Sequence, residues 1–129
     1  MREVAAYLRE TLLPQANVGT VAWLLHRVTG VALAVYLLPH FITINNARGG
    51  AAALDEALGW YTGPLVAAAE WLIVMAAVFH GLNGLRIVAV DFFDLSHRHR
   101  LLFALVLGAT VAVLLASSFL FVPRLLAPV

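Results

Sequence analysis

The chain has 129 residues, of which 63% are hydrophobic and only 12% are charged, and it contains no cysteine. Its mean hydropathy of +0.93 lies far above the soluble range and indicates an integral membrane protein, a single domain over residues 1–129 with no room for a soluble catalytic domain. The lack of cysteine excludes disulfides, thiolate-ligated iron–sulfur clusters and a cysteine nucleophile within the chain, and the net charge of +1 indicates no nucleic-acid partner.

Residues 1–20 are predicted to form a cytoplasmic or interfacial segment. They carry charges and have no apolar run long enough for the core of a signal peptide. Val4, Leu8 and Leu12 recur at four-residue spacing, which predicts a short interfacial helix that ends near Pro14. A mobile polar tail is the alternative.

Three apolar segments, residues 21–44, 65–90 and 101–122, are each long enough to cross the hydrocarbon core as a helix. The predicted fold class is therefore all-α, with three transmembrane helices. Residues 45–63 begin with "NNARGG", whose residue types favour a loop, and are expected to form a short connection, most simply a solvated loop or one with a helical turn. Pro64 has the position of a first-turn proline, which favours a helix start there. A compact polar turn, "DFFDLSHRHR", joins the second and third segments.

The arginines predict the orientation of the chain in the membrane. Two of the eight, Arg48 and Arg124, lie near one side, whereas the remaining six lie near the other: Arg2, Arg9, Arg27, Arg86, Arg98 and Arg100. Positive residues are retained on the cytoplasmic side. The amino terminus and the turn between the second and third segments should therefore be cytoplasmic, and the carboxyl terminus should be outside.

The second segment contains polar residues that hydrocarbon penalises by a few kcal/mol each or more. By helical rise His80 lies about 9 Å from Arg86 and about 16 Å from Asp91, inside the bilayer on its cytoplasmic half. A histidine there can carry a proton or bind a metal. Gly81 and Gly84 remove bulk beside it, at about 1 kcal/mol each relative to alanine, which favours a large planar group such as haem. The alternative is that the glycines serve helix packing and that His80 hydrogen-bonds to another helix.

The first segment has a similar polar pair, His26 and Arg27, at its cytoplasmic end. Arg27 can snorkel toward headgroups. Alternatively, its guanidinium suits a haem propionate or a quinone carbonyl oxygen. His40 lies about 21 Å beyond His26 along the axis, in the outer half of the membrane.

Two motifs together resemble the cytochrome b membrane-anchor subunit of succinate dehydrogenase, the respiratory Complex II. The first, within "LLHRVTG", comprises His26, Arg27, Thr29 and Gly30. The second, within "FHGLNGLRIVAVDF", comprises His80, Gly84, Leu85, Arg86 and Asp91. The three-helix layout extends the resemblance over most of the chain.

The resemblance implies a subunit that anchors a flavoprotein subunit and an iron–sulfur subunit to the bilayer of a prokaryotic cytoplasmic (inner) membrane. It also implies a second small anchor subunit as partner and a site for ubiquinone or menaquinone at the cytoplasmic surface. His80 would be an axial ligand of haem b, with the other ligand from the partner anchor, and Arg27 would lie near quinone and propionate with His26 beside it. The alternatives are a fumarate reductase anchor and a haem-free structural or transport subunit.

This sequence departs from the family pattern at the expected quinone site. Trp23 stands four positions before Arg27, where many relatives have a serine that helps to bind quinone, so the quinone contacts must differ. Thr29 supplies a nearby hydroxyl, and Ile87 replaces a histidine or phenylalanine found in some relatives.

For several other polar residues the sequence leaves more than one role open. Relatives with two haems have a histidine near the outer end of this segment, so His40 is either a distal haem ligand or a histidine that reaches the interface from a helix end perturbed by Pro39. The resemblance also implies that Arg86 and Asp91 lie in the haem propionate or quinone vicinity. At the cytoplasmic rim His26 and Asp91 are candidates for proton delivery to quinone or for its orientation, and the alternative for Asp91 is a pair with Arg86 or a neighbouring arginine. The "HRHR" turn is explained by the positive-inside bias or by contact with the iron–sulfur subunit rather than by metal binding.

Overall fold

The computed structural model describes residues 17–126. Its helices are α2 (Val18–Asn45), α3 (Ala51–Gly59), α4 (Pro64–Phe92) and α5 (His99–Leu126), with 3-10 turns at Asn46–Gly49 and Ser96–Arg98. Three of them, α2, α4 and α5, are long and apolar enough to span a membrane, which confirms the predicted all-α class. The predicted interfacial helix around Val4, Leu8 and Leu12 lies outside the described residues.

Each long helix extends a few residues beyond the apolar segment that predicted it, because a helix continues into the polar residues at its ends. The side chain of Asn17 caps α2 by accepting a hydrogen bond from the Thr20 amide at 2.8 Å. Pro64 opens α4 as predicted and follows Gly63, whose φ of +97° suits glycine.

The connection between the first two spanning helices is more ordered than predicted. It contains the 3-10 turn and the nine-residue helix α3, in place of a solvated loop. Alanine and leucine, which favour helix, fill much of α3. Nor does Pro39 end the first helix, since α2 continues through it to Asn45.

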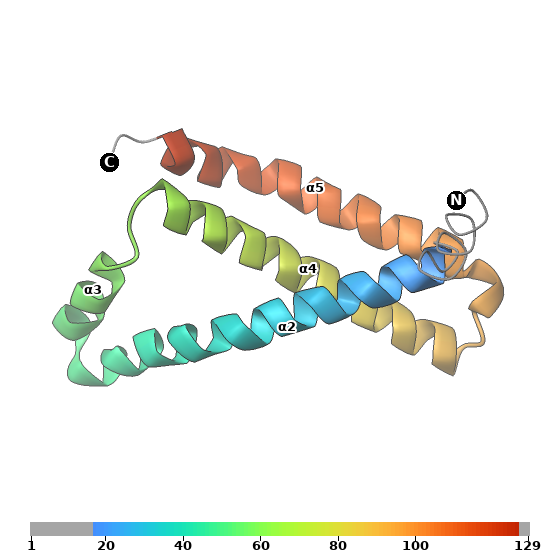
Figure 1. The fold of residues 1–129 in the computed structure, drawn as a ribbon, viewed down its shortest axis with the longest axis horizontal. Helices are drawn as coiled ribbons and strands as arrows, with labels where there is room; N and C mark the ends of the chain where they lie inside the picture. The colour runs from blue at the N-terminus through green and yellow to red at the C-terminus, as the bar shows by residue number, and fades with distance from the viewer. Residues whose placement is uncertain (1–16, 127–129) are drawn as a thin grey trace, which may run out of the picture.

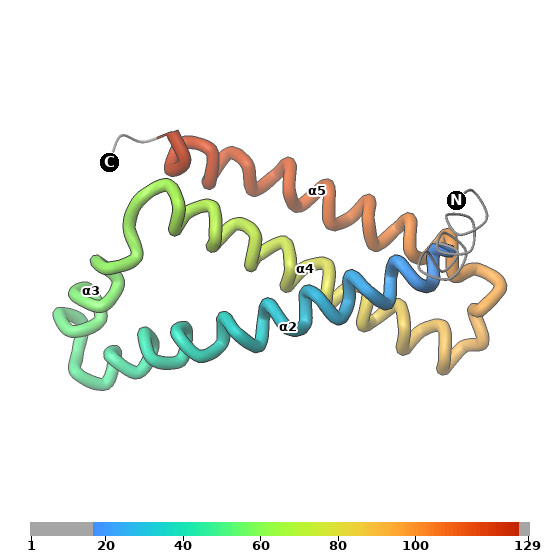
Figure 2. The backbone as a smooth tube through the Cα atoms, in the orientation of Figure 1, coloured from blue at the N-terminus to red at the C-terminus, as the bar shows by residue number. Residues whose placement is uncertain are grey.

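The three spanning helices are arranged so that α4 and α5 pack antiparallel while α2 crosses α4 and then diverges from it toward α3 (Figures 1 and 2). The start of α2 and the α4–α5 connection lie at one end of the molecule. The helix α3 and the end of α5 lie at the opposite end (Figure 1). This topology is the one expected for three successive membrane crossings.

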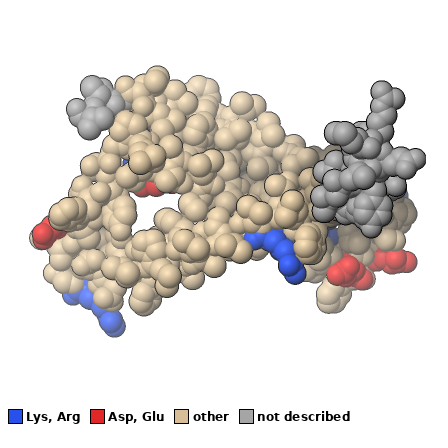
Figure 3. Space-filling model, in the orientation of Figure 1, with Lys and Arg blue, Asp and Glu red and all other residues tan. Residues whose placement is uncertain are grey.

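The chain buries few of its own side chains. Among residues 17–126 one polar side chain, Asn83, and five apolar ones are buried: Ala22, Ala67, Phe79, Phe103 and Val106. Phe79 of α4 and Phe103 of α5 meet edge to face with ring centroids 6.4 Å apart. Most of the visible surface is uncharged, and an opening passes between α2, α3 and α4 (Figure 3). Such a surface is suited to lipid and to other membrane chains.

Candidate functional site

His80 projects from α4 against α2 at the helix crossing, where two acceptor groups meet one of its ring nitrogens. Its Nδ1 lies 3.0 Å from the carbonyl oxygen of His26 and 3.2 Å from Oγ1 of Thr29. The Thr29 hydroxyl donates its own proton to the Leu25 carbonyl at 2.7 Å, so its oxygen is left to accept. Both contacts therefore favour the tautomer of His80 that carries its proton on Nδ1 and a lone pair on Nε2.

The rings of His26 and His80 are stacked. Their centroids are 3.9 Å apart and their planes differ by 8°. This brings together two histidines that are 54 residues apart in the chain. The sequence predicted that both lie in the cytoplasmic half of the membrane, but not that they touch.

The ring of His80 packs against Gly30 of α2, where no Cβ is present. A Cβ placed there would lie 2.9 Å from Cε1 of His80, closer than real side chains approach. By contrast, a Cβ at Gly84 would make an ordinary 3.6 Å contact with His26, and one at Gly81 would meet nothing within 4 Å in the described chain. Packing of Gly81 and Gly84 against a haem stays a prediction, whereas Gly30 had been noted only as part of a motif.

Two side-chain atoms at this crossing are buried without a hydrogen-bond partner in the described chain: Nδ1 of His26 and Oδ1 of Asn83. Asn83 is fully buried, and its Nδ2 lies 3.5 Å from the Ala22 carbonyl oxygen. Asn83 was not among the predicted site residues.

Arg27 leaves the crossing on the outside of α2 and is exposed. Its guanidinium lies over the ring of Trp23, one turn earlier, with 4.3 Å from Cζ to the ring centroid. This is a cation–π contact. Trp23 and Arg27, which the sequence placed in the haem propionate or quinone vicinity, therefore form one unit on the surface.

Arg86 does not pair with Asp91, so the predicted pair of these two residues is wrong, and no ion pair joins Asp91 to another arginine within residues 17–126. Instead, Nε and Nη2 of Arg86 donate to the carbonyl oxygen of His99 at 3.4 and 3.3 Å, and the guanidinium lies 5.6 Å from the Phe103 ring. Residues five apart point to different sides of a helix, so Arg86 faces α5 while Asp91 is exposed. Arg86 of α4 is thus hydrogen-bonded to the first residue of α5.

His40 lies far from the histidine pair, on the diverging half of α2. Its Nδ1 is 3.1 Å from the Tyr36 hydroxyl. Both residues border a cavity of about 420 Å³, which α4 closes with Glu70 and apolar residues. Glu70 also forms a 2.9 Å ion pair with Arg124 of α5. Glu70 was not among the predicted site residues, although a carboxylate within an apolar segment is a detectable signal.

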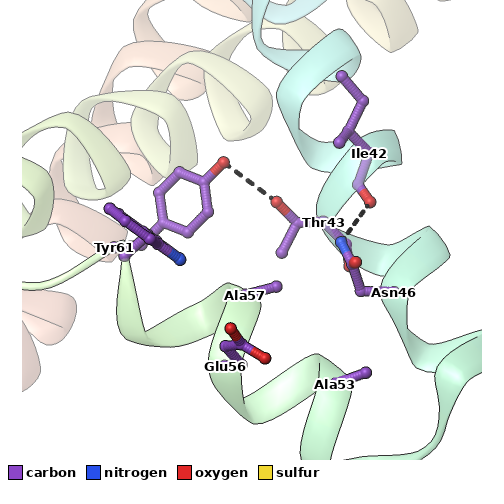
Figure 4. A pocket seen from close by; sticks show the side chains of 8 residues that line it. Ile42, Thr43, Asn46, Ala53, Glu56, Ala57 and Tyr61 are labelled. Carbon is purple, nitrogen blue, oxygen red and sulfur yellow. Dashed lines mark hydrogen bonds between the residues drawn. The ribbon is translucent and has the colours of Figure 1, made fainter.

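A neighbouring cavity of about 370 Å³ lies between α2 and α3. Figure 4 shows the side chains of Thr43 and Tyr61 pointing toward each other across it, with their hydroxyl oxygens 3.2 Å apart. Asn46 turns back to the carbonyl of Ile42 at 3.0 Å. The Thr43–Tyr61 hydrogen bond joins the outer part of α2 to the segment between α3 and α4, whereas the Asn46 hydrogen bond is local to the end of α2.

The residues at the crossing fit a haem better than a bare metal ion. Residues 17–126 contain no cluster of three or more His, Cys, Asp or Glu side chains that would hold an ion. A haem needs only one axial nitrogen from each side. Nε2 of His80 accepts no hydrogen bond within the described chain and is not enclosed by it, so it meets that need.

Three spanning helices with a histidine pair at one crossing define a small integral membrane protein whose described part has no extramembrane domain. A family model described as the succinate dehydrogenase/fumarate reductase transmembrane subunit matches residues 3–117. The chain belongs to this family.

Two relatives agree with that assignment. The succinate dehydrogenase 2 membrane subunit SdhC of Mycobacterium tuberculosis is 26% identical over 106 residues, which cover 82% of this chain and 78% of the relative. The succinate dehydrogenase hydrophobic membrane anchor subunit of Halobacterium salinarum is 34% identical over 76 residues, and this chain spans 58% of that relative's length. The resemblance predicted from the two motifs is thereby confirmed.

Proposed function

We propose that this chain is the haem b-binding membrane anchor of a succinate:quinone oxidoreductase and that His80 is an axial ligand of the haem. The observation that carries the proposal is the pair of acceptors at Nδ1 of His80, the His26 carbonyl and the Thr29 hydroxyl. A ligating histidine commonly donates its other N–H to a backbone carbonyl or a similar acceptor, which fixes the tautomer and the ring. That arrangement is present here before any ligand is added.

The haem, when bound, supplies a one-electron carrier within the membrane. The residues of this chain keep Nε2 of His80 unprotonated and set the ring plane through the stack with His26. A second ligand to the haem would come from the second small anchor subunit.

The quinone site is proposed at the surface formed by Arg27 and Trp23. The guanidinium is exposed, carries five N–H donors and is suited to a carbonyl oxygen of ubiquinone or menaquinone. Thr29 does not serve that site, because its hydroxyl is engaged with the Leu25 carbonyl and with His80. Its role is to support the haem ligand.

The remaining subunits follow from the proposed class. Succinate is oxidised on a flavoprotein subunit, electrons pass through an iron–sulfur subunit, and this chain with its partner anchor attaches both to the prokaryotic cytoplasmic membrane. The amino terminus is cytoplasmic, in line with the arginines near that end. A fumarate reductase anchor would do the reverse, and a comparison of succinate oxidation with quinol-driven fumarate reduction by the purified complex distinguishes the two directions.

A second, distal haem is proposed at His40. The support is that His40 borders the cavity of about 420 Å³ and that its Nδ1 lies 3.1 Å from the Tyr36 hydroxyl, which can accept a hydrogen bond from it. Haem stoichiometry tests this proposal. Two haems per wild-type complex should fall to one in His40→Ala, and a single haem in both complexes contradicts it.

The reduced-minus-oxidised spectrum of the purified complex tests the main proposal. A b-type signal should be lost in His80→Ala and kept in the matched variant His97→Ala, whose histidine lies exposed in the turn between α4 and α5. Added imidazole should restore the signal in His80→Gly, which separates ligation from a failure to assemble. A wild-type complex without a b-type signal, or an unchanged spectrum in His80→Ala, overturns the proposal.

A further inference from the structure

The α2–α4 crossing contains two buried atoms whose hydrogen-bonding capacity is unused. Nδ1 of His26 and Oδ1 of Asn83 have no partner within the described chain. A buried polar group without a partner costs about 1–3 kcal/mol, so such groups are usually satisfied in the native state. The pair therefore calls for a physical explanation.

The two side chains belong to the same small region. The Asn83 amide is directed at the carbonyl of Ala22, which lies one helical turn before His26. The residue after Asn83, Gly84, faces the His26 ring, because a Cβ placed there would be 3.6 Å from Cε1 of His26. The amide thus lies on α4 beside the part of α2 from which His26 projects.

The chemistry of the two atoms is complementary. Nδ2 of Asn83 faces a carbonyl oxygen, which only a donor can satisfy, so the amide orientation is fixed and Oδ1 is left as an acceptor. Of the buried unpartnered side-chain atoms in residues 17–126, the other is Nδ1 of His26, which can donate. Both atoms are already enclosed by this chain alone, so a haem or a partner subunit that docks on the surface does not reach them.

We propose that one enclosed water accepts a hydrogen bond from Nδ1–H of His26 and donates one to Oδ1 of Asn83. A single bridging water is nearly as favourable as a direct contact and occurs commonly at buried polar sites. Asn83 is then a positioning residue. It fixes His26 in the Nδ1–H tautomer and holds its ring parallel to His80, so that α4 orients His26 while α2 orients His80.

Two variants separate this role from simple packing. Asn83→Leu keeps a side chain of similar size but has no acceptor, whereas Asn83→Asp keeps the shape and an acceptor oxygen. The readout is the electron paramagnetic resonance spectrum of the oxidised haem in the intact complex, which reports the orientation of the axial imidazoles. This readout rests on the proposed function, because it requires a bound haem. Asn83→Leu should shift the largest g value by more than the wild-type line width, and Asn83→Asp should leave it within that width.

A second measurement does not depend on haem. A density map of the complete complex, at a resolution that shows ordered water, should show one water within hydrogen-bond distance of both Oδ1 of Asn83 and Nδ1 of His26. A map in which Oδ1 has another partner overturns the inference, as does an unchanged g value in Asn83→Leu. If the Asn83→Leu complex does not assemble, the density map and the electron paramagnetic resonance spectrum of Asn83→Asp test the inference. A wild-type complex without a b-type signal contradicts the proposed function instead, and the map still tests the hydrogen bond.

Discussion

The imidazole of His26 lies flat against that of His80, with 3.9 Å between centroids and 8° between planes. The backbone carbonyl of His26 meets the edge of the same ring at Nδ1. One residue of α2 therefore restrains both the face and the edge of a side chain that α4 carries. The orientation of His80 is consequently a property of the crossing between two helices, and changes in α2 should affect it.

Substitution of Gly30 by alanine tests this dependence. The new Cβ would lie 2.9 Å from Cε1 of His80, so the ring must turn away from the His26 carbonyl. Overpacking of this kind typically costs about 1–3 kcal/mol. We expect Gly30→Ala to lower the haem content of the purified complex, measured as haem absorbance per protein. Gly108→Ala on α5, where a Cβ meets nothing within 4 Å in the described chain, is the control, and equal losses in the two variants would contradict the prediction.

Thr29 should affect haem retention through its hydroxyl. Thr29→Val removes one of the two acceptors at Nδ1 of His80 and keeps the shape of the side chain, whereas Thr29→Ser keeps the acceptor. Loss of such a supporting group typically weakens metal binding about 10–100-fold, and we expect the lower end because the His26 carbonyl remains. The rate of haem transfer to apomyoglobin measures the change. A serine variant that loses haem as fast as the valine variant would point to packing instead.

The contact between Trp23 and Arg27 should tune quinone binding. An exposed cation–π contact is worth about 0.5–1 kcal/mol, which corresponds to about a two- to fivefold change in an equilibrium constant. We expect Trp23→Ala to raise KM for quinone by that factor with little change in kcat, and Trp23→Phe to retain most of the affinity. Steady-state kinetics with a short-chain quinone checks this. A fall in kcat at constant KM would exclude a role in orienting the guanidinium for binding.

The opposite end of the α4–α5 pair offers a stability test. Nε1 of Trp71 donates to Oγ of Ser117 at 2.8 Å, and the Trp71 ring stacks on Phe121. Hydrogen bonds between membrane helices average about 0.6 kcal/mol, so Trp71→Phe and Ser117→Ala should each destabilise the complex by about that amount. Thermal unfolding of the two single variants and the double variant forms a cycle. Additive losses would show that the two side chains are not coupled.

The sequence predicted the spanning helices well because length and apolarity alone decide whether a segment crosses a bilayer. It also selected His26, Arg27 and His80, because polar side chains inside an apolar segment are conspicuous. It underestimated α3, since a short helix at the end of a loop has no comparable constraint. The family assignment, made on two motifs, needed no knowledge of how those motifs lie in space.

The details of the site could not be predicted, because they depend on how each helix is rotated at the crossing. The contact of Gly30 with His80 and the burial of Asn83 arise between two helices, and neither helix alone indicates them. For the same reason a pair between Asp91 and Arg86, its neighbour in sequence, was one plausible interpretation, although Arg86 faces α5. Glu70 was a signal that the sequence contained, and its partner Arg124 lies 54 positions later, at the far end of the last helix.

The divergence of α2 from α4 has a consequence for the life of the protein in the cell. An unassembled copy would expose the cavity between the two helices to acyl chains, which offer no hydrogen bond to the polar atoms of Tyr36, His40 and Glu70 beyond the Tyr36–His40 contact and the Glu70–Arg124 ion pair. We therefore expect newly inserted copies to be short-lived until another component occupies that space. The steady-state amount of the chain would then follow the supply of its companions rather than its own rate of synthesis.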